Sequence, residues 1–205
     1  MTMRPWLSRW TTIAVCLFAV GCADSQPTRF YTLSPLAEAP GGTPPAILPD
    51  LTVGVGPVIL PSYLDRPQLV TRAGSNRVVL ADFDSWAEPL DGLFARVLAE
   101  NLTLLLGTDD VLALPQRRPM TLDYQVEVDV ARFDVDASGN ANLDARWWVF
   151  GRNGEKLLQS VRSTITEPSP PGDYTAAAAA LSRALGNMST EIAQAIADQV
   201  GSRRR

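Results

Sequence analysis

The side chains that most often carry enzymatic chemistry are nearly absent from this sequence. Its 205 residues include no histidine and only two cysteines, Cys16 and Cys22. Without an imidazole there is no Ser-His-Asp triad, no imidazole general base and no His-based zinc site. Lysine occurs only at Lys156, which leaves almost no place for a Schiff base or a phosphate-binding lysine. We therefore expect a protein that is not an enzyme, has no catalytic residues and binds no cofactor.

One acidic segment has the spacing of a calcium ligand set. Asp134, Asp136 and Ser138 occupy positions one, three and five of an EF-hand pattern, and a glycine occupies position six. The twelfth position, where the pattern needs a bidentate glutamate, is Ala145. The flanking residues alternate between apolar and polar side chains as strands do. The segment therefore predicts a hairpin turn and no metal site.

A second acidic pair, Asp82 and Asp84, shares one face of a predicted strand. Two carboxylates can divide the roles of acid and base when their environments differ. No third polar group accompanies this pair in the sequence. We therefore expect both carboxylates to lie at a solvated strand end.

The segment Leu60–Pro67 is the strongest candidate for recognition. Pro61 and Pro67 bracket it, and prolines reduce the entropy that a loop loses when it becomes ordered. A preorganised loop with polar side chains is a common recognition element. A structural alternative is that Asp65 and Arg66 pair with each other or cap a neighbouring turn. The candidate partner-binding residues are Tyr63, Leu64, Asp65, Arg66 and, further along the chain, Trp86.

Hydrophobic periodicity indicates the elements that must position these residues. Apolar side chains recur at i, i+3, i+4 and i+7 from Pro89 to Leu106, which predicts a helix that Gly107 ends. Strands are predicted over residues 30–33 and 51–58, and a hairpin over 68–72 and 77–81.

The second half of the chain begins with a period of two. Residues 122–130 alternate as a half-buried strand does, and the phase changes at Ala131–Arg132, which predicts a bulge. Strands at 142–150 and 156–166 follow, joined by an Asn153-Gly154 turn, and a helix runs from Asp173 to Gly201. The predicted fold is α/β: one domain with a mixed sheet of about five to seven strands, ending in an antiparallel meander, packed by two long helices.

The start of the chain resembles an export signal. Arg4 and Arg9 precede a short apolar run that is too short to span a membrane, and Ala19-Val20-Gly21-Cys22 resembles a bacterial lipobox. A plain secretory peptide is the alternative. We expect Cys22 to be lipidated and to anchor the protein to the membrane. The second mature residue is Ala23 instead of Asp, which favours the outer membrane, facing the periplasm, over the inner membrane.

The expected organisation follows from these features. Residues 1–21 are a signal peptide, 22–28 a tether, 29–201 one periplasmic domain with a Pro/Gly-rich insert at 39–50, and 202–205 a basic tail. The composition, 46% hydrophobic and 20% charged, is that of a globular protein. A net charge of −4 argues against a nucleic-acid partner.

Three motifs resemble those of the ABC-type transport auxiliary lipoprotein family, of the PqiC (YmbA) type. They are Phe30–Pro35, Val53–Arg72 with its Leu-Pro-Ser-Tyr-Leu-Asp-Arg core, and Trp86–Leu90. The resemblance implies a periplasmic domain similar to the N-terminal domain of TolB, an anticodon-binding-like arrangement in three layers. It also implies a role beside an MCE-domain protein and an ABC permease and ATPase, which move lipids between the two bacterial membranes.

Two functions of different classes stay open on the sequence alone. The first is a non-enzymatic accessory component of such a lipid transport system. The second is an envelope scaffold or regulator that acts on cell-wall enzymes, because TolB-like domains also occur in lipoproteins of that kind. Either function is compatible with a homo-oligomer.

Overall fold

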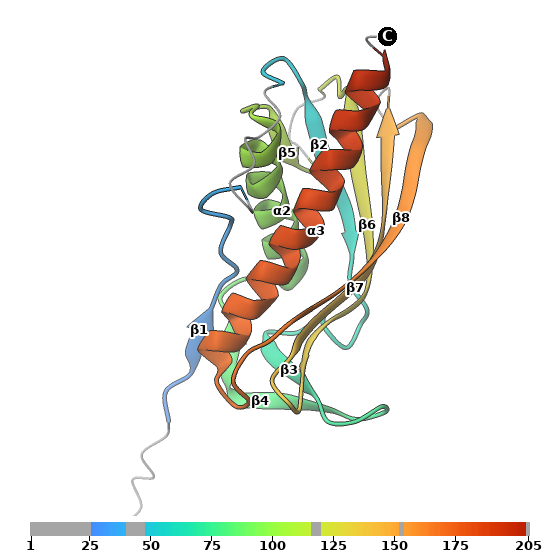
Figure 1. Ribbon diagram of the computed structural model, residues 1–205. Helices are drawn as coiled ribbons and strands as arrows, with labels where there is room; N and C mark the ends of the chain where they lie inside the picture. Colours follow the sequence, from blue (N-terminus) through green and yellow to red (C-terminus); the bar gives the residue numbers. More distant parts are fainter. Residues whose placement is uncertain (1–25, 40–47, 116–119, 152–153, 204–205) are drawn as a thin grey trace, which may run out of the picture.

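The computed structural model describes residues 26–39, 48–115, 120–151 and 154–203. The predicted signal, Cys22, most of the insert at 39–50 and Asn153 lie outside the described residues. Two helices and eight strands are present in these ranges (Figure 1). In chain order they are β1 Arg29–Tyr31, β2 Val53–Ile59, β3 Gln68–Arg72, β4 Val78–Trp86, α2 Leu90–Leu106, β5 Val111–Ala113, β6 Tyr124–Asp136, β7 Ala141–Gly151, β8 Lys156–Glu167 and α3 Tyr174–Arg203.

Helix α2 has the limits that its sequence pattern predicts. Its apolar stripe, which includes Leu93, Phe94 and Leu98, is buried completely. Pro89 precedes the helix, and Gly107 ends it in the left-handed conformation at a φ of 59°. Helix α3 continues past the predicted end at Gly201 to Arg203.

The meander of β6, β7 and β8 also follows the alternation in the sequence. In β6, Tyr124, Val126 and Val128 are buried while the residues between them are not. The register of β6 and β7 shifts between Val130 and Arg132, so the predicted bulge is confirmed. Asp136 accepts backbone hydrogen bonds from Ser138 and Asn140 in the turn to β7, which confirms the hairpin.

Strand β6 is the branch point of the sheet. On one edge it pairs with β7 along its whole length. On the other edge its first half pairs in parallel with β2, and its last two residues pair in parallel with β3. The sheet therefore forks at β6: β2 continues to β5, and β3 continues to β4 and β1. The segment between β2 and β3 leaves the sheet at this fork.

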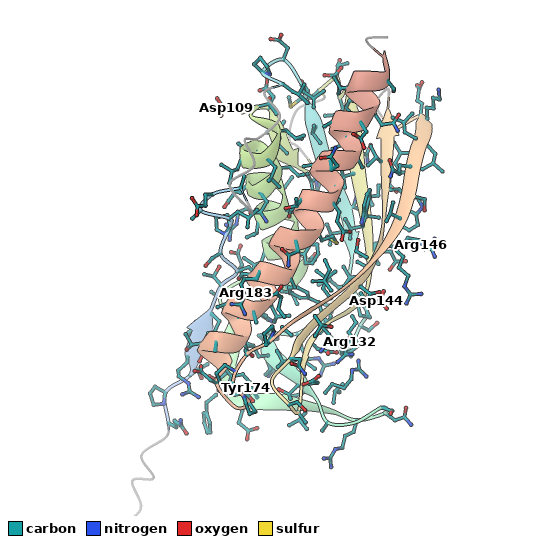
Figure 2. All side chains as sticks on the ribbon, viewed as in Figure 1. Asp109, Arg132, Asp144, Arg146, Tyr174 and Arg183 are labelled. Carbon is teal, nitrogen blue, oxygen red and sulfur yellow. The ribbon has the colours of Figure 1, made fainter. Side chains whose placement is uncertain are left out.

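Both helices cover the same face of the sheet. Helix α2 contacts β2 and β5, α3 contacts β6, β7 and β8, and the two helices contact each other (Figure 1). The opposite face of the meander carries charged side chains such as Arg132, Asp144 and Arg146 (Figure 2). The single α/β domain with a mixed sheet and two long helices is confirmed.

The strand count exceeds the predicted five to seven by one. The additional strand, β5, has only three residues, Val111–Ala113, and follows the turn after α2. Three residues are too few for a hydrophobic period to be recognised. Its backbone pairs with Val53–Val55 of β2, and these long-range hydrogen bonds define it as a strand.

The chain that follows β1 is held on the helices by buried polar groups. The amide of Leu36 donates to Asn101 Oδ1 at 2.8 Å, and the amide of Ser34 donates to Ser182 Oγ at 3.0 Å. Asn101 also donates to Ser189 Oγ at 3.0 Å, so it links α2 and α3. These bonds satisfy polar atoms that burial would otherwise leave unpaired.

Candidate functional site

The Leu60–Pro67 loop projects from the fork of the sheet. It joins β2 to β3, and both of these strands run parallel to β6. Within the loop, the amide of Leu64 donates to the carbonyl of Pro61 at 2.8 Å. The amide of Trp86 on β4 donates to the carbonyl of Pro67 at 2.6 Å. The end of the loop at Pro67 is thus fixed to β4, and the turn after Pro61 is closed by a hydrogen bond within the loop.

The predicted partner-binding residues do not form one exposed surface. Leu64 is 2% exposed and Trp86 is 5% exposed, so both belong to the core. Tyr63 is half-buried and packs against that core. Asp65 is exposed and Arg66 is half-buried. Among the ion pairs of the described residues, none joins Asp65 to Arg66, so the structural alternative of a mutual pair is not what the loop adopts.

Tyr63 is held by a buried carboxylate that the sequence did not single out for this role. Its hydroxyl donates to Asp134 Oδ2 at 3.0 Å. Arg72 Nε donates to the same oxygen at 3.1 Å, and Arg132 Nε donates to Oδ1 at 2.7 Å. The Asp134 side chain is completely buried. The carboxylate therefore ties the loop to β3 and to the end of β6.

The environment of this cluster changes the acidity of Tyr63. Burial raises the pKa of the Tyr63 phenol, and the neighbouring Asp134 carboxylate raises it further. The guanidinium of Arg72 lies over the Tyr63 ring, 5.4 Å from its centroid. The Tyr63 side chain is therefore neutral and held in one position within the loop. The sequence signal for this cluster was Asp134, which lies between two apolar residues and two positions after Arg132.

Three hollows meet around the first turn of α2. The largest, about 450 Å³, lies between residues 56–58, Leu114 and Asp91. The second, about 190 Å³, shares Val58 and Asp91 with the first and is lined by Ser62. The third, about 340 Å³, shares Asp65 and Leu90 with the second and reaches Glu88. The three hollows are neighbours that share lining residues, and together we name them the α2 groove.

The α2 groove is lined by four of the five predicted partner-binding residues, all except Tyr63. Leu64 and Asp65 line the second hollow. Asp65, Arg66 and Trp86 line the third. Arg66 Nε is buried there, and no acceptor among the described residues forms a hydrogen bond with it. The acidic groups are Asp65, Glu88 and Asp91, so the rim carries more negative than positive charge.

The lining supports binding better than catalysis. Prolines and leucines provide apolar surface, and the carboxylates and the Arg66 guanidinium provide ionic contacts.

In the part of the chain that the structure describes, no three acidic or thiol side chains come together as a metal site would require. Within those same residues, neither helix combines the length and the apolar character needed to cross a membrane.

A second ionic cluster attaches β1 to β4. Arg29 Nε lies 2.8 Å from Asp84 Oδ1, and the Tyr31 hydroxyl donates to the same oxygen at 2.7 Å. Asp84 is 3% exposed, so the expectation of a solvated strand end is wrong for this residue and holds only for Asp82. Burial alone would raise the pKa of Asp84, but the hydrogen bonds from Arg29 and Tyr31 outweigh burial and lower it.

The Asp84 cluster makes the attachment of β1 dependent on pH. Because the folded-state pKa of Asp84 lies below its value in the unfolded chain, about 3.9, its stabilisation is present above that pH. It is lost as the pH falls through the folded-state pKa. We expect the amides of β1 to exchange faster under those acidic conditions, measured by hydrogen exchange. Asp84→Asn should cost about 1–3 kcal/mol at neutral pH and remove this acid dependence. Equal pH profiles for the two proteins would contradict the assignment.

Comparison with known proteins relates this geometry to other chains. Residues 31–193 match the model of a family described as the ABC-type transport auxiliary lipoprotein component. A protein from Xanthomonas campestris assigned to DUF330 superposes with a TM-score of 0.68 at 20% sequence identity, covering 85% of this chain and 99% of that one. An uncharacterized protein superposes with a TM-score of 0.65 at 19% identity, covering 83% and 99%. At these low sequence identities, the superpositions show that the chains share a fold. No curated protein matches the chain.

Proposed function

Because the chain belongs to the ABC-type transport auxiliary lipoprotein family, we propose that it is a non-enzymatic accessory component of an MCE-type system that moves lipids between membranes. The family match carries this proposal, because it extends from Tyr31 in β1 to Ala193 in α3 and so includes the fork and the α2 groove. Members of this family are auxiliary components of ABC-type transport and are membrane-anchored periplasmic lipoproteins. The MCE-domain partner and the lipid cargo are part of the proposal.

The proposed anchor is Cys22. Acylation of this residue places lipid chains in the bilayer, where each buried CH₂ contributes about 0.8 kcal/mol. The residue after it, Ala23, favours the outer membrane over the inner membrane. With the signal removed, Cys16 is lost and Cys22 is acylated, so the periplasmic domain has no free thiol.

The proposed docking site for the transporter is the α2 groove. Its occupant in this proposal is a segment of the MCE-domain protein or the ABC permease that carries apolar side chains and at least one charged group. Asp65 and Arg66 are the members of the candidate set that a partner can reach. Tyr63, Leu64 and Trp86 support the groove from the core side. Arg66 can satisfy its buried Nε with a partner acceptor, and a guanidinium pairs well with a carboxylate.

Cys22→Ser tests the anchoring half of the proposal. The variant should move from the membrane fraction to the soluble periplasm, because it has no site for acyl chains, while its melting temperature stays unchanged. Wild-type protein purified from detergent-solubilised envelopes should recover an MCE-domain protein or an ABC permease subunit, identified by mass spectrometry. Unchanged membrane fractionation of the variant would refute the anchor. Recovery of cell-wall synthesis enzymes alone would support the scaffold function instead.

A further inference from the structure

The exposed apolar side chains gather at one end of the molecule. Among the described residues, eight large hydrophobic side chains are exposed, and five of these belong to β1 or β4. Phe30 is the most exposed of the five, at 69%. Soluble proteins rarely leave such a cluster uncovered without a reason. We name this surface the apolar end; its residues are Phe30, Val78, Val79, Leu80 and Phe83.

The apolar end is continuous with the beginning of the folded chain. Strand β1 pairs in parallel with residues 84–86 of β4, directly beside Phe83. Figure 1 shows that the chain enters the fold at this end, below the first turn of α3. Tyr174, which starts α3, lies at the same end (Figure 2) and lines a hollow of about 190 Å³ together with Val79. Three segments that are distant in sequence thus lie at one end of the molecule.

The tether is too short to hold this end far from a membrane. Seven residue steps separate Cys22 from Arg29 in the sequence. A fully extended chain covers at most about 3.3–3.6 Å per residue, so the tether spans at most about 25 Å. If the acyl chains of Cys22 enter the bilayer, β1 lies within that distance of it.

The charges at this end give a contact with lipid little electrostatic support. The charge of Arg29 is paired with Asp84. Arg77, directly before β4, is exposed, and so is Asp82, which carries the opposite charge. Attraction to anionic headgroups therefore contributes little, and burial of apolar and aromatic surface at the interface is the main driving force.

We propose that the apolar end lies on the phospholipid bilayer, with its side chains at the boundary between headgroups and acyl chains. This inference rests on the proposed lipid anchor and adds to it a second contact, which fixes how the domain stands on the membrane. The acyl chains alone would leave the domain free to rotate about its tether. The apolar end selects one orientation because it gains free energy only when it faces the lipid.

Two single-cysteine variants of the lipidated protein test the orientation. Leu80→Cys places a thiol in the apolar end, and Leu157→Cys places one at the start of β8, at the opposite end of the meander. Leu157 is 53% exposed against 37% for Leu80, so the control position is the more accessible of the two. Each thiol is labelled with a polarity-sensitive fluorophore. The labelled proteins are reconstituted into phosphatidylethanolamine–phosphatidylglycerol vesicles that contain a spin-labelled phospholipid as quencher.

The proposal predicts a blue shift and a loss of fluorescence by lipid quenching at position 80, and neither effect at position 157. The quenching should persist at high salt, because the contact is apolar. Equal quenching at both positions, or quenching at position 80 that disappears at high salt, would overturn the inference. A blue shift at position 80 that grows with protein density without lipid quenching would overturn it in favour of a second copy of the chain. Failure of the protein to co-float with vesicles would refute the anchor, and the proposed function would then fail first.

Discussion

Gly139→Ala is expected to cause one of the two largest losses of stability in this protein. Gly139 has a φ of 90°, a region that residues with a Cβ rarely adopt. A Cβ at this position would lie 2.1 Å from the carbonyl oxygen of Ser169 and 2.7 Å from the nitrogen of Pro171. Both of these atoms belong to the backbone of the segment that leads into α3. That segment must move before any side chain fits.

Gly74→Ala is the matched control for this substitution. Gly74 has nearly the same φ, 91°, but nothing lies within 4 Å of the Cβ that alanine would add. Its cost is therefore conformational strain alone, about 1–2 kcal/mol. Gly139→Ala adds the cost of displacing packed backbone, about 1–3 kcal/mol more. Chemical denaturation of both variants measures the difference, and equal losses would show that the 169–171 segment moves freely.

Asp134→Asn should give a loss of similar size for an electrostatic reason. The substitution removes the negative charge that compensates Arg72 and Arg132, whose side chains are only 24% and 29% exposed. Removing one partner from a buried ion pair costs about 3–5 kcal/mol. The partial exposure of both guanidinium groups favours the lower end, about 3 kcal/mol. For a domain of this size, such a loss lowers the melting temperature by about 6–12 °C.

Asp144→Asn provides the control for the Asp134 prediction. Asp144 also pairs with an arginine on a neighbouring strand, but its partner, Arg162, is 58% exposed. An ion pair of that kind contributes about 0–1 kcal/mol. If the two variants lose the same amount of stability, the Asp134 cluster does not hold the Leu60–Pro67 loop in the way that its geometry indicates.

The long elements of this fold could be predicted because their periodicity is repeated many times. The apolar stripe of α2 is repeated over four turns, and β6 alternates over residues 124–130 before its bulge. The bulge itself was visible as a change of phase at Ala131–Arg132. Local patterns of this kind depend on neighbours in the sequence, and one sequence is enough to show them.

The fork and the site could not be predicted because they depend on long-range pairing. Tyr63 and Asp134 are 71 residues apart, and no local pattern joins them. The EF-hand-like spacing drew attention to the turn at Asp134, although its carboxylate faces two arginines. The sequence predicts Leu64 and Trp86 as partner-binding residues, but both side chains are buried in the core, which depends on segments that are distant in the sequence.

We propose that this protein serves a transport assembly by docking it in the α2 groove. A photo-cross-linking amino acid at Asp65, in cells that express the lipidated chain, tests this docking. Thr164, exposed on β8, is the control position. We expect a cross-link from position 65 to an MCE-domain protein or an ABC permease subunit, and none to that subunit from position 164. Cross-links to that subunit of equal yield at both positions, or cross-links from position 65 to cell-wall enzymes alone, would show that the α2 groove is not the docking site.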